Sequence, residues 1–217
     1  MQVIDLIKEF DKLQVKYGDK TLDAIYGAGE IDNPDICLVF MNPTGRNISS
    51  NKNWKGLKAP WIGTKNVWKM FFQLGLLDKE AFSEIQAKKS TDWNYIFSEK
   101  IYNKVKSNSL YITNLSKATQ LDARHLKNEI FQKYLPLFYQ EISQVNPKVI
   151  ITFGNQVSSI LLRKRIKVSE YRKKYELIDV NGKETRVFPV YYPVGQGMRN
   201  MKKAKEDIDF IIKTNIG

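Results

Sequence analysis

The stretch ICLVFMNPTG, residues 36–45, decides the fold of this chain. Its first six residues are apolar without alternation, which is typical of a strand buried on both faces in the middle of a sheet. The strand ends directly in Asn42, and Pro43 restricts Asn42 to extended geometry. Gly45 allows the backbone to approach a ligand closely. Because open α/β sheets bind ligands at the carboxyl ends of their strands, we expect Asn42 at the mouth of a crevice.

Two further strand ends lead to polar turns of the same kind. Residues 110–113 form a short apolar strand that ends at Asn114, and residues 185–191 form a strand that leads to Tyr192. A third buried strand is expected at 149–153. In a parallel sheet the carboxyl ends of strands lie on one edge, so Asn42, Asn114 and the turn 193–199 are expected to meet at one crevice.

Helical segments separate these strands along the chain. Apolar residues recur at helical spacing in several segments, which we expect to be helices: 2–16, 64–74, 79–89, 94–105, 124–145, 157–162 and 198–213. Thr64 is expected to be the N-cap of the second helix. Asn181-Gly182 predicts a hairpin between strands 175–180 and 185–191. Strands separated by helices predict a three-layer α/β/α sandwich with a central, mostly parallel sheet. We expect one domain over residues 1–217, with 1–25 as an N-terminal helical extension.

Composition limits the class of partner. The chain has 217 residues and a formal net charge of +12, which favours a polyanionic partner such as a nucleic acid, although a basic proteome gives the same excess. No run of roughly 18 apolar residues suggests a membrane span, and no signal-peptide pattern begins the chain, so a cytoplasmic protein is expected. One cysteine and one histidine, His125, give no metal-ligand spacing. We therefore expect no metal and no cofactor.

These strand-end motifs together resemble the uracil-DNA glycosylase superfamily over residues 26–217. In its single-strand-selective and mismatch-specific branches the first turn reads G-[MI]-N-P-G, and residues 40–44 here read FMNPT. The P-F-V-G of the iron–sulfur branches is matched by PWIG at 60–63, and their strand ending in T-N by YITN at 111–114. A proline-led strand ending in glycine resembles residues 147–154. The last motif, H-P-S with a following arginine, is matched in part by YPV at 192–194 and by Arg199.

The resemblance implies a DNA glycosylase that flips a base from the helix during base excision repair. It assigns to Asn42 the positioning of the attacking water, to Trp61 stacking on the base, and to Asn114 pairing with O4 and N3–H of uracil. Met41 and Pro43 are expected to line the base pocket beside Asn42. Four residues are expected to contact the DNA backbone: Lys117, Gly195, Gln196 and Arg199. The implied partner is single- or double-stranded DNA, bound by a monomer.

Tyr192 is where the chain departs from the family. The superfamily histidine at this place donates a hydrogen bond to O2 of the departing uracil, and Tyr192 or Gln196 would have to replace it. Two alternatives therefore stay open. One is a DNA-binding protein of the same fold with weak or no catalysis, and the other is an α/β enzyme acting on free nucleosides or nucleotides.

Overall fold

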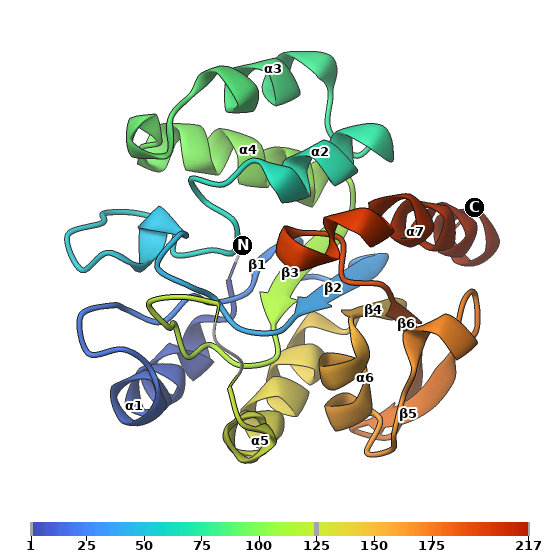
Figure 1. Ribbon diagram of the computed structural model, residues 1–217. Helices are drawn as coiled ribbons and strands as arrows, with labels where there is room; N and C mark the ends of the chain where they lie inside the picture. Colours follow the sequence, from blue (N-terminus) through green and yellow to red (C-terminus); the bar gives the residue numbers. More distant parts are fainter. Residues whose placement is uncertain (1, 124–125, 217) are drawn as a thin grey trace.

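The computed structural model describes residues 2–123 and 126–216, in which a six-stranded sheet has helices on both faces (Figure 1). The strands are β1 (Ala28–Gly29), β2 (Ile36–Phe40), β3 (Leu110–Asn114), β4 (Val149–Phe153), β5 (Glu176–Val180) and β6 (Lys183–Val190). Their order in the sheet is β1-β3-β2-β4-β6-β5. The four inner strands run parallel, whereas β1 and β5 pair antiparallel at the two edges. The expected mostly parallel α/β/α architecture is confirmed.

The helices form the two outer layers. They are α1 (Ile7–Tyr17), α2 (Asn66–Gln73), α3 (Lys79–Ala87), α4 (Tyr95–Ser107), α5 (Asn128–Val145), α6 (Asn155–Leu161) and α7 (Met201–Asn215). Short 3-10 helices lie at Ile4–Leu6, Ile48–Ser50, Ser90–Asp92, Val168–Glu170 and Gly195–Asn200. One face of the sheet is covered by α2, α3, α4 and α7, and the other by α1, α5 and α6 (Figure 1). No helix in these described ranges is long and apolar enough to cross a membrane.

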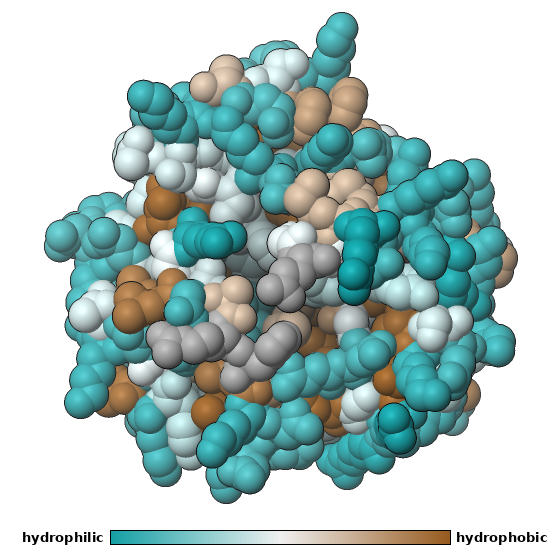
Figure 2. Space-filling model, viewed as in Figure 1, coloured by the Kyte–Doolittle hydropathy of each residue, from teal (hydrophilic) through white to brown (hydrophobic). Residues whose placement is uncertain are grey.

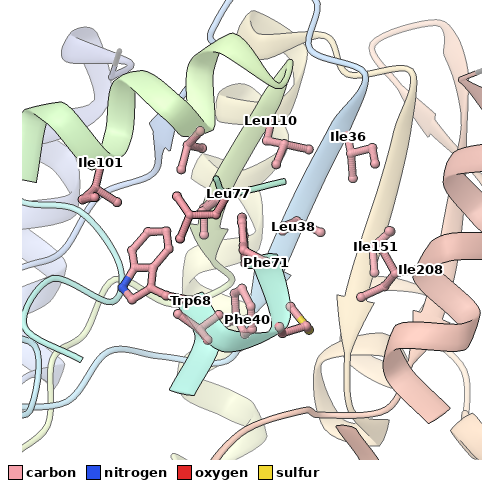
Figure 3. Packing of buried hydrophobic residues seen from close by; sticks show 14 of the residues in the cluster. Ile36, Leu38, Phe40, Trp68, Phe71, Leu77, Ile101, Leu110, Ile151 and Ile208 are labelled. Atoms are coloured by element: carbon pink, nitrogen blue, oxygen red, sulfur yellow. The ribbon is translucent and has the colours of Figure 1, made fainter. Parts of the chain in front are cut away.

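The middle strand β2 contributes to two separate hydrophobic cores. Ile36, Leu38 and Phe40 point to the layer of α2, α4 and α7, where Figure 3 shows them among side chains of those helices. Cys37 and Val39 point to the layer of α1, α5 and α6. Because successive side chains of a strand alternate between faces, a strand buried on both faces must be apolar at every position. This explains the continuous run of apolar residues.

Two local expectations differ from the structure, and one strand was not expected. Helix α2 begins at Asn66 with Lys65 as its N-cap, and the Thr64 hydroxyl instead donates to the carbonyl of Trp61 at 2.8 Å. Helix α5 begins at Asn128 rather than 124, and residues 124–125 lie outside the described chain. The two-residue strand β1 is too short to leave a periodic pattern in the sequence.

Candidate active site at the carboxyl ends of the strands

The carboxyl ends of β2 and β3 lie side by side. Phe40 is the register partner of Asn114 in this parallel pair. The pairing continues past the strands, because the backbone N–H of Leu115 donates to the Phe40 carbonyl at 2.8 Å and that of Ser116 to the Met41 carbonyl at 3.0 Å. The turn that holds Asn42 is therefore fixed against the segment that follows Asn114, as the sequence predicts for parallel strands.

A second pair of hydrogen bonds fixes the turn further along. The N–H of Gln120 donates to the Pro43 carbonyl at 3.1 Å, and the N–H of Gly45 donates to the Gln120 carbonyl at 2.8 Å. A backbone held at both ends in this way changes little when a ligand arrives, which suits a group that must be placed accurately.

Asn42 itself keeps its side-chain oxygen available. The residue is half-buried, and its Nδ2 donates to the carbonyl of Pro43 at 3.1 Å. Its Oδ1 accepts no hydrogen bond from any residue that the structure describes. A carbonyl oxygen of an amide has two lone pairs, so this atom can accept a hydrogen bond from a water molecule.

Trp61 has an unusual backbone and an unsatisfied indole. Its φ is +68°, in the left-handed region that a bulky residue rarely adopts, so the conformation is strained. Three donors hold its carbonyl, namely Thr64 through its N–H and its hydroxyl, and the Trp68 indole at 3.2 Å. The Nε1 of Trp61 is buried and donates to no described residue. Strain of this kind concentrates at ligand sites.

The ring of Phe40 brings Trp61 and Tyr192 together. Phe40 makes an edge contact with Trp61 at 4.9 Å between ring centroids and with Tyr192 at 6.3 Å, and it stacks on Phe153 at 4.3 Å. The side chain belongs to the last residue of β2, two positions before Asn42. Two residues far apart in the sequence, one after a long loop and one after β6, are thus anchored to one aromatic ring.

Tyr192 lies where a glycine, Gly197, allows close packing. A Cβ on Gly197 would lie 2.1 Å from the carbonyl oxygen of Tyr192, so only glycine fits there. The hydroxyl of Tyr192 makes no hydrogen bond to the described part of the chain. Burial raises the pKa of Tyr192 to about 12, so the hydroxyl carries its proton throughout the physiological range.

This shift gives a prediction for alkaline stability. The folded protein holds the Tyr192 proton up to a pKa of about 12, whereas in the unfolded chain it is lost near 10.0. The corresponding stabilisation is complete below about pH 10 and is lost as the pH rises towards 12. We expect urea unfolding to show a smaller loss of stability between about pH 10 and 11 in Tyr192→Phe than in the wild type. Equal losses in both proteins would contradict the shift.

Asn114 and Lys117 are both buried, but only Lys117 has a side-chain partner among the described residues. Asn114 is 3% exposed, and its side-chain amide makes no hydrogen bond within the described residues. The phosphate contact expected of Lys117 is wrong, because this side chain is 0% exposed and forms a 2.5 Å ion pair with Glu141 of α5. Burial lowers the pKa of Lys117, although the Glu141 carboxylate favours its charged form. A fully enclosed ammonium cannot meet DNA.

The remaining candidates lie around the same edge of the sheet. Arg199 and Gly195 are exposed in the 3-10 helix before α7, where the Arg199 guanidinium has no ion pair with a described residue. The side chain of Gln196 lies outside what the structure describes. Pro43 is buried and Met41 is half-buried against the core. Figure 2 shows a hollow near the centre of this face, with both hydrophilic and hydrophobic residues around it.

The basic segment 163–174 is occupied largely by internal contacts. Lys164 pairs with Glu176 at 2.6 Å and Lys167 with Glu170 at 3.0 Å. Arg172 binds Asp207 of α7 through two nitrogens, Nε at 3.0 Å and Nη2 at 2.9 Å. The pairs of Lys164 and Arg172 attach the segment to β5 and α7, and all three pairs leave fewer free cations than its composition indicates.

Glu141 lies in α5, outside the strand-end motifs of the sequence. This carboxylate is 1% exposed and binds three side chains in β3 and just after its carboxyl end, namely Tyr111, Thr113 and Lys117. A signal was present, because Glu141 falls at helical spacing with the buried residues Tyr134, Phe138 and Val145. An acid on the apolar face of a helix indicates a buried partner.

Comparison with known proteins agrees with this geometry. No curated protein sequence matches the chain. A model of the uracil DNA glycosylase superfamily matches residues 26–214, which is most of the chain and includes every strand of the sheet. Together with the parallel sheet and the polar strand ends, this match shows that the chain belongs to the uracil DNA glycosylase superfamily.

Proposed function

We propose that this protein is a cytoplasmic, single-domain DNA glycosylase that removes uracil or a related damaged base from DNA. The observation that carries the proposal is the placement of Asn42 and Asn114 at the ends of paired strands, where the Oδ1 of Asn42 and the side-chain amide of Asn114 have no hydrogen bond to a described residue. Trp61 and Tyr192 both contact Phe40, which is the register partner of Asn114. The net charge of +12 favours binding to a polyanion such as DNA.

Base recognition follows from the amide chemistry of Asn114. A base cannot be cut from its sugar while it is stacked in a duplex, so it enters the site flipped out or from a single strand. The Asn114 amide supplies one acceptor and one donor group, which complement N3–H and O4 of uracil and mismatch cytosine. Stacking on Trp61 would add about 1–3 kcal/mol.

Bond cleavage needs a water molecule and a departing base. In this proposal the Oδ1 of Asn42 accepts a hydrogen bond from water and holds its oxygen below C1′ of the deoxyribose. The C1′–N1 bond breaks with its electron pair leaving on uracil, and the water oxygen bonds to C1′. The proton that the water loses passes to solvent, and the uracil anion takes up a proton from solvent after it leaves. The Tyr192 hydroxyl donates a hydrogen bond to O2 of the uracil anion, and the products are free uracil and an abasic site.

The test is excision from synthetic DNA. Single- and double-stranded oligonucleotides with one uracil are incubated with the protein, treated with alkali and separated on a gel. Cleavage at the uracil position supports the glycosylase. DNA binding without cleavage at high protein concentration would instead support the catalytically weak binding protein, for which the replacement of histidine by Tyr192 is the specific argument. Release of uracil from free deoxyuridine would favour a nucleoside enzyme.

Tyr192→Phe tests the proposed leaving-group contact. The variant keeps the ring that packs on Phe40 and removes only the hydroxyl. Because a hydrogen bond to a charged group contributes about 1.5–3 kcal/mol, we expect the single-turnover rate of uracil excision to fall by about 10–100-fold. Full activity in this variant would remove Tyr192 from the mechanism.

A further inference from the structure

A buried ion pair lies directly behind the strand end that carries Asn114. The Nζ of Lys117 donates to Oε2 of Glu141 at 2.5 Å, to the Asn114 carbonyl at 2.7 Å and to Oγ1 of Thr113 at 2.7 Å. All three donors of the ammonium therefore have acceptors. Two of these acceptors belong to the last two residues of β3.

Glu141 completes the network from the side of α5. Its Oε1 accepts hydrogen bonds from the hydroxyls of Tyr111 and Thr113, both at 2.8 Å. Gly27 closes the space, because a Cβ at that position would lie 2.2 Å from the Tyr111 hydroxyl and 2.5 Å from Oε1 of Glu141. Tyr111 and Thr113, two residues apart in β3, thus both bind the Glu141 carboxylate.

Aromatic rings enclose the ammonium on its other sides. The Nζ of Lys117 lies 4.9 Å from the ring centroid of Phe10 and 5.8 Å from that of Phe138. Burying two ions costs several kcal/mol for each, and replacement by apolar residues is often neutral or stabilising. A buried ion pair therefore stabilises a core no better than apolar residues do, which indicates that this pair has a role other than stability.

The role of the ion pair concerns Asn114. Its side-chain amide has no hydrogen bond to the described protein, so where the amide points depends on its backbone and on the side chains packed around it. The bond from Lys117 ends on the carbonyl of that same residue. We propose that Lys117, held by Glu141, is a positioning residue that orients Asn114 towards the base and so sets selection of uracil. This inference rests on the proposed glycosylase function.

The decisive protein is the double variant Lys117→Met/Glu141→Leu. Lys117→Met alone leaves an uncompensated buried carboxylate and is expected to unfold easily. The double variant removes both charges, so its fold is expected to stay intact, yet the Asn114 carbonyl then loses the 2.7 Å hydrogen bond from Lys117 and keeps only the 3.5 Å one from the Thr113 hydroxyl. The matched control is Arg172→Met/Asp207→Leu, which removes another pair with a 0% exposed carboxylate that lies between segment 163–174 and α7.

Single-turnover uracil excision is measured as a function of DNA concentration, on proteins whose folding is verified by urea unfolding. In the double variant we expect the maximal rate to fall by about 10-fold or more, as expected for a misplaced group. The half-saturating DNA concentration should change by less than about 3-fold, because the proposed phosphate contacts lie elsewhere. The control should keep the wild-type rate.

The outcomes separate the two claims. A folded double variant with the wild-type maximal rate overturns the positioning role and leaves the glycosylase function standing. Equal rate losses in the double variant and the control also overturn it, because they show a general effect of stability. A wild-type protein without excision overturns the proposed function and this inference with it.

Discussion

Replacement of Asn42 by alanine is expected to lower the single-turnover rate of uracil excision by about 10²–10³-fold. The reason is that water is a weak nucleophile whose reactivity at C1′ depends on placement, and Asn42 Oδ1 is the acceptor proposed to place it. The fold should be unaffected, since the only hydrogen bond of this side chain in the described structure is the local one to Pro43. The rate is measured with excess protein over a uracil-containing oligonucleotide.

Two further variants make this result specific. Asn53→Ala removes an exposed asparagine from the same connection between β2 and α2, residues 41–65, and should leave the rate unchanged. Asn42→Asp keeps an oxygen acceptor at the same place and should retain most of the activity. If Asn42→Ala were as fast as the wild type, the attacking water would have to be held by another group.

Phe40→Ala is expected to have the largest effect on stability. Phe40 is 1% exposed and contacts rings from a loop, from β4 and from the segment after β6. Truncation of a buried phenylalanine costs about 3–5 kcal/mol of unfolding free energy. Because Trp61 and Tyr192 lose their common contact, excision should also fall at temperatures where the variant is folded. Urea unfolding and single-turnover assays measure the two effects.

Phe131→Ala separates site geometry from stability. Phe131 is 0% exposed and lies in the core on the opposite face of the sheet. We expect a similar loss of stability, about 3–5 kcal/mol, with excision by the folded fraction unchanged. Unchanged excision in folded Phe40→Ala would show that the ring does not organise the site.

The succession of strands and helices along the chain made the arrangement of Asn42 and Asn114 predictable. The unbroken apolar run 36–41 indicated a strand buried on both faces, and β2 does lie between β3 and β4. Because the carboxyl ends of parallel strands lie at one edge of a sheet, Asn42 was expected near Asn114 from the sequence alone. The fold and the nearness of these two strand ends therefore follow from patterns that can be read in the sequence.

Side-chain direction was less predictable. Lys117 comes three residues after a strand, and nothing in that spacing tells whether the chain turns its ammonium to solvent or to Glu141. Trp61 adopts a positive φ without being a glycine, so local preference gave no sign of it. Both features depend on contacts between segments far apart in the sequence, which a local pattern does not encode.

Measurement of free uracil tests the central claim most directly. The wild-type protein, in excess over an oligonucleotide with a single uracil, is expected to release one uracil for each abasic site formed, as quantified by chromatography and by alkali cleavage of the same sample. Bound DNA that yields neither free uracil nor an abasic site would contradict the account.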